Sequence, residues 1–154
     1  MSHDLIFERH TDLTCAQIWR AWTTPDLICE WFCPLPWKVT ECQIDLRPGG
    51  HFRTVMCSPE RASFPHVGCY LEIVPFEKLV WTNALQPGYA PATEVSPMIT
   101  AIISMTSTSQ GTHYHARALH KDENDRAAHD AMGFQAGWGK AFDQLEALMK
   151  RTPV

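Results

Sequence analysis

Hydrophobic and polar positions along the chain change their spacing twice, which divides the sequence into three parts. Apolar residues recur every three to four positions between Cys15 and Phe32, alternate with polar residues from Trp37 to His120, and return to the wider spacing from Asp122 onward. The wider spacing places side chains on one face of a helix, whereas alternation places them on one face of a strand. The pattern therefore predicts two short helices, a series of strands and one long C-terminal helix.

The two short helices carry recognisable start and stop signals. Thr14 and Gln17 have the spacing of a capping box, in which each side chain bonds the backbone amide of the other residue. Thr24 has the form of an N-cap for the second helix, with Pro25 at its first position. The Pro34-Leu35-Pro36 segment ends that helix, because proline disfavours helical geometry in the residue before it.

Short turn signals separate the predicted strands. Pro48-Gly49-Gly50 predicts a tight turn, because glycine adopts a positive φ without steric cost. Weak periodicity predicts a loop at 58–65 and a mobile connection at 86–97. The predicted strands are 5–9, 37–46, 51–56, 68–73, 79–85, 98–108 and 112–120. Strands that are joined by short turns form an antiparallel meander, so the predicted fold class is α+β.

The last helix, predicted to begin near Asp122 and to end near Lys150, has an apolar face. That face carries Met132, Phe134, Trp138, Phe142, Leu145 and Met149. A strongly curved sheet cannot cover its concave side with its own side chains, so we expect this helix to cover it. Large and small residues that line such a gap unevenly leave an apolar cavity, which is the default hypothesis for a ligand site.

Composition narrows the class of protein. The length of 154 residues is near the common size of one domain, and 45% hydrophobic with 19% charged residues suffice for a packed core. A net charge of −4 without a basic cluster counts against nucleic acid as the main partner. Neither a secretory signal nor an apolar run of about 18 residues is recognisable, so no membrane span is predicted. The six cysteines are therefore expected to be reduced thiols, which favours a cytoplasmic protein. We expect one domain over residues 1–154.

Several segments, taken in this order, resemble one protein family. They are IWRAWTTP at 18–25, Trp31, DLRPGGHF at 45–52, GCYLEI at 68–73, KLVWT at 78–82 and Gly137-Trp138. From about residue 5 to residue 150 the chain is similar to the START-like (SRPBCC, birch-pollen-allergen-like) superfamily. The similar branch is the one related to the C-terminal domain of the activator of the 90-kDa heat-shock-protein ATPase. The chain departs from it at Trp81-Thr82, where many relatives have Thr-Trp.

The resemblance implies a helix-grip fold, in which a strongly curved antiparallel seven-stranded sheet holds a long C-terminal helix and two short helices follow the first strand. It further implies an apolar cavity, because relatives bind lipids, sterols, polyketides or plant hormones, and some are cyclases or oxygenase subunits. In the eukaryotic activator a separate N-terminal domain makes a principal chaperone contact. Nothing in this chain corresponds to that domain, so the resemblance does not favour a chaperone partner.

Large rings, a methionine and their polar neighbours on the strands are the candidates for lining such a cavity. The predicted lining is Trp31, Phe32, Met56, Tyr70, Glu72, Trp81, Trp138 and Phe142. Tyr70 and Glu72 share one predicted strand face, and a carboxyl group in an apolar cavity has a raised pKa that suits acid–base catalysis. The alternative is that Glu72 pairs with Arg53 or Arg47 and only orients the strand.

One cysteine pair and one histidine pair are candidates for metal sites, but their patterns favour other roles. Cys29 and Cys33 are four residues apart on a predicted helix, but they lack the CxxC form and a second pair nearby. Small buried thiols explain them better than a zinc site does. His113 and His115 share a strand face with Arg117, which is more typical of a solvated outer surface than of a metal site.

The remaining polar candidates leave the function open. His51, Arg53 and His66 would form a cluster able to hold a carboxylate head group if their strands pair, although exposed polar faces produce the same pattern. No catalytic group, metal or cofactor is assigned. The first hypothesis is therefore the binding of an apolar or amphipathic small molecule without catalysis, and the second is a polyketide-cyclase-like enzyme that uses Glu72 and Tyr70.

Association with other proteins supplies a third hypothesis. A co-chaperone or another protein-interaction module would expose an apolar patch of more than about a few hundred Å² on its outer surface. A homodimer would form if the edge strand at 5–9 paired between two chains, because the outer side of an edge strand presents unpaired backbone groups.

Overall fold

One curved antiparallel sheet organises the protein. The computed structural model describes residues 3–93 and 98–153, and within them seven strands pair in the order β1-β9-β8-β5-β4-β3-β2. The strands are β1 (Asp4–Thr11), β2 (Lys38–Ile44), β3 (His51–Cys57), β4 (Ser63–Val74), β5 (Lys78–Thr82), β8 (Thr100–Thr108) and β9 (Gly111–Leu119). Strand β1 pairs with β9, so that β1 and β2 form the two edges. The predicted α+β class and antiparallel sheet are confirmed.

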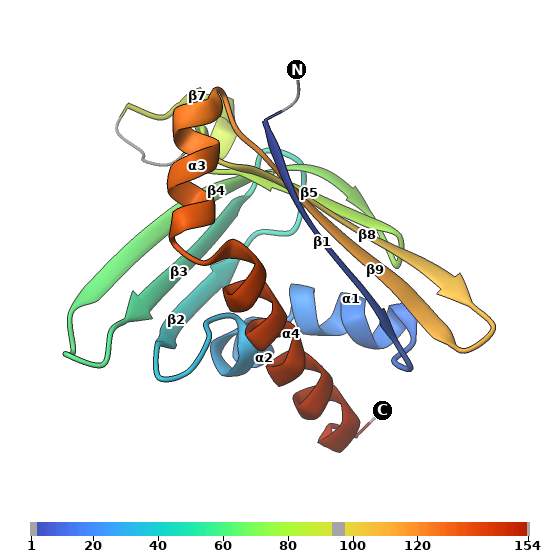
Figure 1. Ribbon diagram of the computed structural model, residues 1–154. Coiled ribbons are helices and arrows are strands. Elements are labelled where there is room, and N and C mark those ends of the chain that lie inside the picture. Colours follow the sequence, from blue (N-terminus) through green and yellow to red (C-terminus); the bar gives the residue numbers. More distant parts are fainter. Residues whose placement is uncertain (1–2, 94–97, 154) are drawn as a thin grey trace.

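The helices lie on the concave side of this sheet. Within the described residues they are α1 (Cys15–Thr23), α2 (Pro25–Trp31), α3 (Glu123–Ala131) and α4 (Phe134–Arg151), and none of them is long and apolar enough to cross a membrane. Figure 1 shows the sheet curving around α4, with α1 and α2 beside it. This is the helix-grip arrangement that the resemblance implies. Helix α1 begins with the predicted capping box, in which the Gln17 amide donates to the Thr14 hydroxyl over 3.1 Å.

The C-terminal helix differs from the prediction of one continuous element. It is broken between α3 and α4 at Gly133, whose φ of 89° lies in the left-handed region that favours glycine. Asp122 caps the separate helix α3 by accepting from the Asp125 amide over 2.9 Å. Because of the break, Met132 leaves the predicted apolar face and is 72% exposed. Phe134 and Phe142 keep the buried positions that the pattern predicted.

Two predicted connections are also shorter than expected. Strand β4 begins at Ser63, so the loop predicted at 58–65 is a tight turn closed by the Ser58 amide, which donates to the Ala62 carbonyl over 2.9 Å. Part of the connection predicted at 86–97 is ordered as β6 (Leu85–Gln86), η1 (Pro87–Tyr89) and β7 (Ala90–Pro91), while 94–97 lie outside the described residues. Strand β2 ends at Ile44, two residues before the predicted end.

The exposed side of the edge strand β1 is partly covered by side chains of α4. The Gln135 amide donates to the Ile6 carbonyl over 2.6 Å, and the Thr11 hydroxyl donates to the Glu146 carboxylate, also over 2.6 Å. Arg9 forms an ion pair with Asp143. Edge strands in natural proteins are commonly protected in this way against pairing with another chain. A homodimer through β1 stays a prediction, and it would have to displace the contact with Ile6.

The aromatic core is joined by one buried hydroxyl group. Tyr114 of β9 is fully buried, and its oxygen accepts hydrogen bonds from the indole N–H groups of Trp22 over 3.2 Å and Trp138 over 3.3 Å. Its ring also lies 4.4 Å, between centroids, from that of Phe142. Trp22 belongs to α1, whereas Trp138 and Phe142 belong to α4. A single side chain of the sheet therefore orients both helices.

This junction predicts the effect of removing one oxygen atom. We expect Tyr114→Phe to lower the free energy of unfolding by about 2–4 kcal/mol, because the buried indole of Trp22 and the half-buried indole of Trp138 lose their acceptor while the ring remains. Urea denaturation followed by circular dichroism measures the change. Tyr89→Phe is the matched control, since Tyr89 is 50% exposed, and should change stability by less than about 0.5 kcal/mol. Equal stabilities of the two variants would contradict the role given to the Tyr114 hydroxyl.

Candidate ligand-binding cavity

An apolar cavity of about 290 Å³ lies between the helices and the sheet. Its walls come from α1, α2 and the segment after it, strands β3 and β5, and the junction of α3 with α4. The lining residues are Trp22, Trp31, Phe32, Pro34, Met56, Trp81, His129, Met132, Gly133, Phe134, Gly137, Trp138 and Ala141. Among these described residues, His129 is the one with a titratable side chain. The volume is near the lower end of the range of about 300–1,000 Å³ that is usual for small-molecule sites.

Small residues on α4 explain why this space is not filled. Phe134, Gly137, Trp138 and Ala141 follow one another at the spacing i, i+3, i+4, i+7, which places all of them on one face of the helix. Two large rings therefore alternate with a glycine and an alanine along the wall. A side chain of ordinary size at Gly137 would have no protein atom nearer to its Cβ than Pro34 Cγ, at 3.8 Å.

Five of the eight predicted lining residues contribute to this cavity. They are Trp31, Phe32, Met56, Trp81 and Trp138. The Trp31 indole N–H donates to the Ala21 carbonyl over 3.0 Å, which holds its ring in place. By contrast, the indole N–H of Trp81 is buried and has no hydrogen-bond acceptor within the described residues. Phe142 lies deeper, in the core beside Tyr114.

The predicted pair of Tyr70 and Glu72 is separated by a β-bulge. Tyr70 opposes Trp81 on β5, but the register shifts by one residue before Glu72, which opposes Val80. Tyr70 is therefore fully buried and stacks on Phe52 at 5.5 Å, whereas Glu72 is exposed. The extra residue changes the alternation on which the prediction of a shared face depended, so that prediction is wrong.

Each member of that pair has its own surroundings. The Tyr70 hydroxyl has no hydrogen-bond partner within the described residues, and its burial raises the pKa of the phenol far above the usual range. Glu72 forms an ion pair with Lys78, at 3.1 Å, rather than with Arg53 or Arg47 as the structural alternative proposed. The geometry therefore contains no acid–base pair between these two residues.

His129 is the functional candidate that the sequence analysis missed. Its Nδ1 lies 2.8 Å from Nε2 of His120, and its ring packs in a T-shaped arrangement with that of Phe134, at 5.1 Å between centroids. Burial, and to a lesser extent the neighbouring His120, lowers the pKa of His129 to about 4. In a continuous helix, at about 100° per residue, position 129 would face away from the apolar stripe. The break at Gly133 is what turns it toward the cavity.

The other predicted polar groups lie away from this cavity. His113 and His115 are half-buried on the outer face of β9, where His113 lies 3.3 Å from Glu8. Within the described residues, no group of three or more His, Cys, Asp or Glu side chains could hold a metal ion. Arg53 and His66 border a separate hollow of about 50 Å³ on β2–β4, which His51 does not line.

The two cysteines of the predicted pair do not both lie on helix α2. Cys29 lies within α2, whereas Cys33 lies beyond its last residue, and both are free thiols. Burial raises the pKa of Cys33 to about 11, so the neutral thiol is the form present near neutral pH. A buried neutral thiol behaves as a small apolar side chain.

The lowered pKa of His129 predicts a pH dependence of stability. The unfolded chain binds a proton at this residue near the ordinary pKa of 6.5, but the folded protein does so only near 4. Stability from this group is therefore lost as the pH falls from about 6.5 and levels off below about 4. As the pH is lowered from about 6.5 to about 4, we expect the wild-type protein to lose stability relative to His129→Phe, as measured by urea denaturation. Parallel curves, or the same shift in the outer-face control His113→Phe, would contradict it.

Comparison with known proteins places this geometry in a family. Residues 12–150 match the family described as Activator of Hsp90 ATPase homolog 1-like protein. A crystal structure of a protein from Nitrosomonas europaea is 44% identical, with a TM-score of 0.92, over 96% of this chain and 94% of that one. No curated protein matches the chain.

More distant structures share the fold alone. A Rhodobacter sphaeroides protein is 21% identical, with a TM-score of 0.83, over 97% of this chain and 93% of that one. An Arthrobacter aurescens protein is 16% identical, with a TM-score of 0.83, over 98% of this chain and 88% of that one. The resemblance drawn from the sequence motifs is thereby confirmed, and the chain belongs to the Activator of Hsp90 ATPase homolog 1-like protein family, in the START-like superfamily.

Proposed function

We propose that this protein binds a small apolar or amphipathic molecule in the cavity between α4 and the sheet, and that it does so without catalysing a reaction. The observation that carries the proposal is a cavity of about 290 Å³ whose walls are mainly aromatic rings. Rings bury large apolar areas and orient a ligand by edge and face contacts. The indole N–H of Trp81 in the same wall, unpaired among the described residues, adds a buried donor that an oxygen of a bound molecule would satisfy.

The walls of the cavity are held in place before any molecule enters. Trp138 and Trp22 donate to the same Tyr114 oxygen, and Trp31 donates to a backbone carbonyl. Phe32 contacts the rings of Trp22 and Trp31 edge-on at 5.6 and 5.5 Å between centroids. A preformed site loses little conformational entropy on binding, so apolar burial contributes more fully to affinity.

The enzymatic alternative lacks the groups on which it depended. A cyclase that uses Glu72 and Tyr70 requires both side chains at the substrate, and Glu72 is exposed and paired with Lys78. We therefore retain binding without catalysis. All six cysteines lie in the described part of the chain and are free thiols, which supports the further proposal of a cytoplasmic location. The pairing of seven described strands in one sheet supports the proposal of one domain.

Native mass spectrometry of the purified protein is the direct test of occupancy. We expect a fraction of the molecules to retain an apolar small molecule, which extraction then identifies. A protein that is isolated empty should take up 2-methoxynaphthalene, a neutral aromatic probe, with chemical-shift changes at the residues of the cavity. An empty protein that does not bind the probe would overturn the proposal.

Filling the cavity should remove binding without damaging the fold. We expect Gly137→Leu to weaken the binding of 2-methoxynaphthalene by about tenfold or more, because the new side chain occupies the space beside Trp138. Stability should not fall, since leucine favours a helix over glycine by about 1 kcal/mol. Affinity is measured by NMR titration and stability by urea denaturation.

A second glycine of α4 provides the control. A Cβ at Gly139 would lie 3.5 Å from Arg9 and 3.6 Å from Phe7, away from the cavity. Gly139→Ala should therefore share the gain in helix stability and leave the affinity for the probe unchanged. If Gly137→Leu folds and still binds the probe with wild-type affinity, the cavity is not the binding site.

A further inference from the structure

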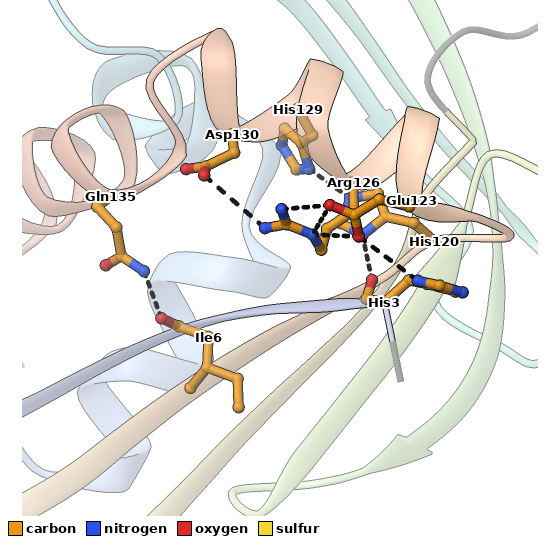
Figure 2. Close-up of polar contacts among 8 residues, drawn as sticks. All are labelled: His3, Ile6, His120, Glu123, Arg126, His129, Asp130 and Gln135. Atoms are coloured by element: carbon orange, nitrogen blue, oxygen red, sulfur yellow. Dashed lines mark hydrogen bonds and ion pairs between the residues drawn. The ribbon is translucent and has the colours of Figure 1, made fainter. Parts of the chain in front are cut away.

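Two hydrogen bonds connect the cavity to the start of the sheet. Nδ1 of His120 lies 2.7 Å from the His3 carbonyl oxygen, and Nε2 of His120 lies 2.8 Å from Nδ1 of His129. Figure 2 shows the three residues in this order, from the strand to helix α3. His129 is the member of the series that lines the cavity.

The direction of these bonds determines where the protons lie. A carbonyl oxygen can only accept, so Nδ1 of His120 must carry the proton of the first bond. The Nε2 of a neutral His120 is then unprotonated and accepts, which requires Nδ1 of His129 to donate. The Nε2 of a neutral His129 is therefore unprotonated as well. Within the described residues, the ring of His129 makes one hydrogen bond, through Nδ1, which leaves Nε2 without a protein partner.

The surroundings keep His129 neutral. Burial and His120 lower its pKa to about 4, and the nearby Asp130 opposes this only weakly. Asp130 lies 3.8 Å from Arg126, which also pairs with Glu123, so the charged groups of α3 are engaged with one another (Figure 2). On its other side the histidine ring contacts Phe134.

We propose that Nε2 of His129 is the hydrogen-bond acceptor of the cavity, and that it selects apolar molecules that carry a hydroxyl or N–H donor. The inference rests on the proposed function, since it concerns the same cavity. A donor within an otherwise apolar molecule gains a partner at His129, whereas an ether at the same place does not. Carboxylates are disfavoured, because a neutral acceptor repels them and the described lining residues include no lysine or arginine.

Three probes of one ring system test the preference. These are 2-naphthol, which donates, 2-methoxynaphthalene, which keeps the oxygen but cannot donate, and 2-naphthoate, which is an anion at pH 7. We expect ¹H–¹⁵N NMR titration to give a dissociation constant about fivefold or more lower for 2-naphthol than for the ether, the worth of one hydrogen bond. The carboxylate should bind more weakly than either.

Two phenylalanine variants assign the preference to one residue. His129→Phe should lose the preference for 2-naphthol over the ether, because phenylalanine keeps an aromatic ring at this position but removes the acceptor. His113→Phe, the same change on the outer face of β9, should retain the preference. A preference that survives in His129→Phe overturns the inference.

The inference and the proposed function fail in different ways. Equal affinity of the wild-type protein for 2-naphthol and the ether, with shifts at the cavity, overturns the role of His129 and leaves the binding function intact. The absence of binding by all three probes overturns the binding function itself.

A measurement on the unaltered protein keeps the inference testable if the variants do not fold. Long-range ¹H–¹⁵N correlation of histidine-labelled protein at pH 7 reports which ring nitrogen is protonated. We expect the proton of His129 on Nδ1. A proton on Nε2 overturns the inference.

Discussion

The hydroxyl group of Tyr114 is the point on which the rest of the structure depends. It is a polar atom in the middle of an aromatic core, and such an atom is tolerated there only when it is paired. Two indole N–H groups supply that pairing, one from α1 and one from α4, so the strand β9 determines how both helices lie. These hydrogen bonds hold the rings of Trp22 and Trp138 in the lining of the cavity and keep them from filling the adjacent space.

The cavity follows from this arrangement together with the size of its neighbours. Trp138 is held toward Tyr114, and Gly137 and Ala141 beside it are too small to fill the gap. Close packing is the rule in protein interiors, so a space of this size lined by rings requires a reason. Proteins of the same fold perform unrelated tasks, so the lining of this cavity, and not membership of the family, is what points to ligand binding.

Helix α3 contributes a different kind of wall. Its side chains are partly or fully exposed, and polar contacts hold it, such as the Asp125 carboxylate that accepts from the Met98 amide over 3.2 Å. Exposed polar contacts of this sort stabilise weakly compared with the apolar packing of α4. The cavity is thus bounded on one side by the rigid core and on the other by an element attached mainly through hydrogen bonds. His129 belongs to the second side and is the titratable residue among the described lining residues.

The sequence by itself determined the order of elements, the α+β class and most of the aromatic lining. Periodicity and capping are local properties, and large rings such as Trp31, Phe32 and Trp81 pack against the core wherever the fold places them. Tertiary structure alone decided the rest. The bulge after Tyr70 moved Glu72 to the other face, because an inserted residue changes an alternation that local pattern assumes to be regular. The break at Gly133 turned His129 inward, since a left-handed glycine redirects a helix in a way that depends on what the helix packs against.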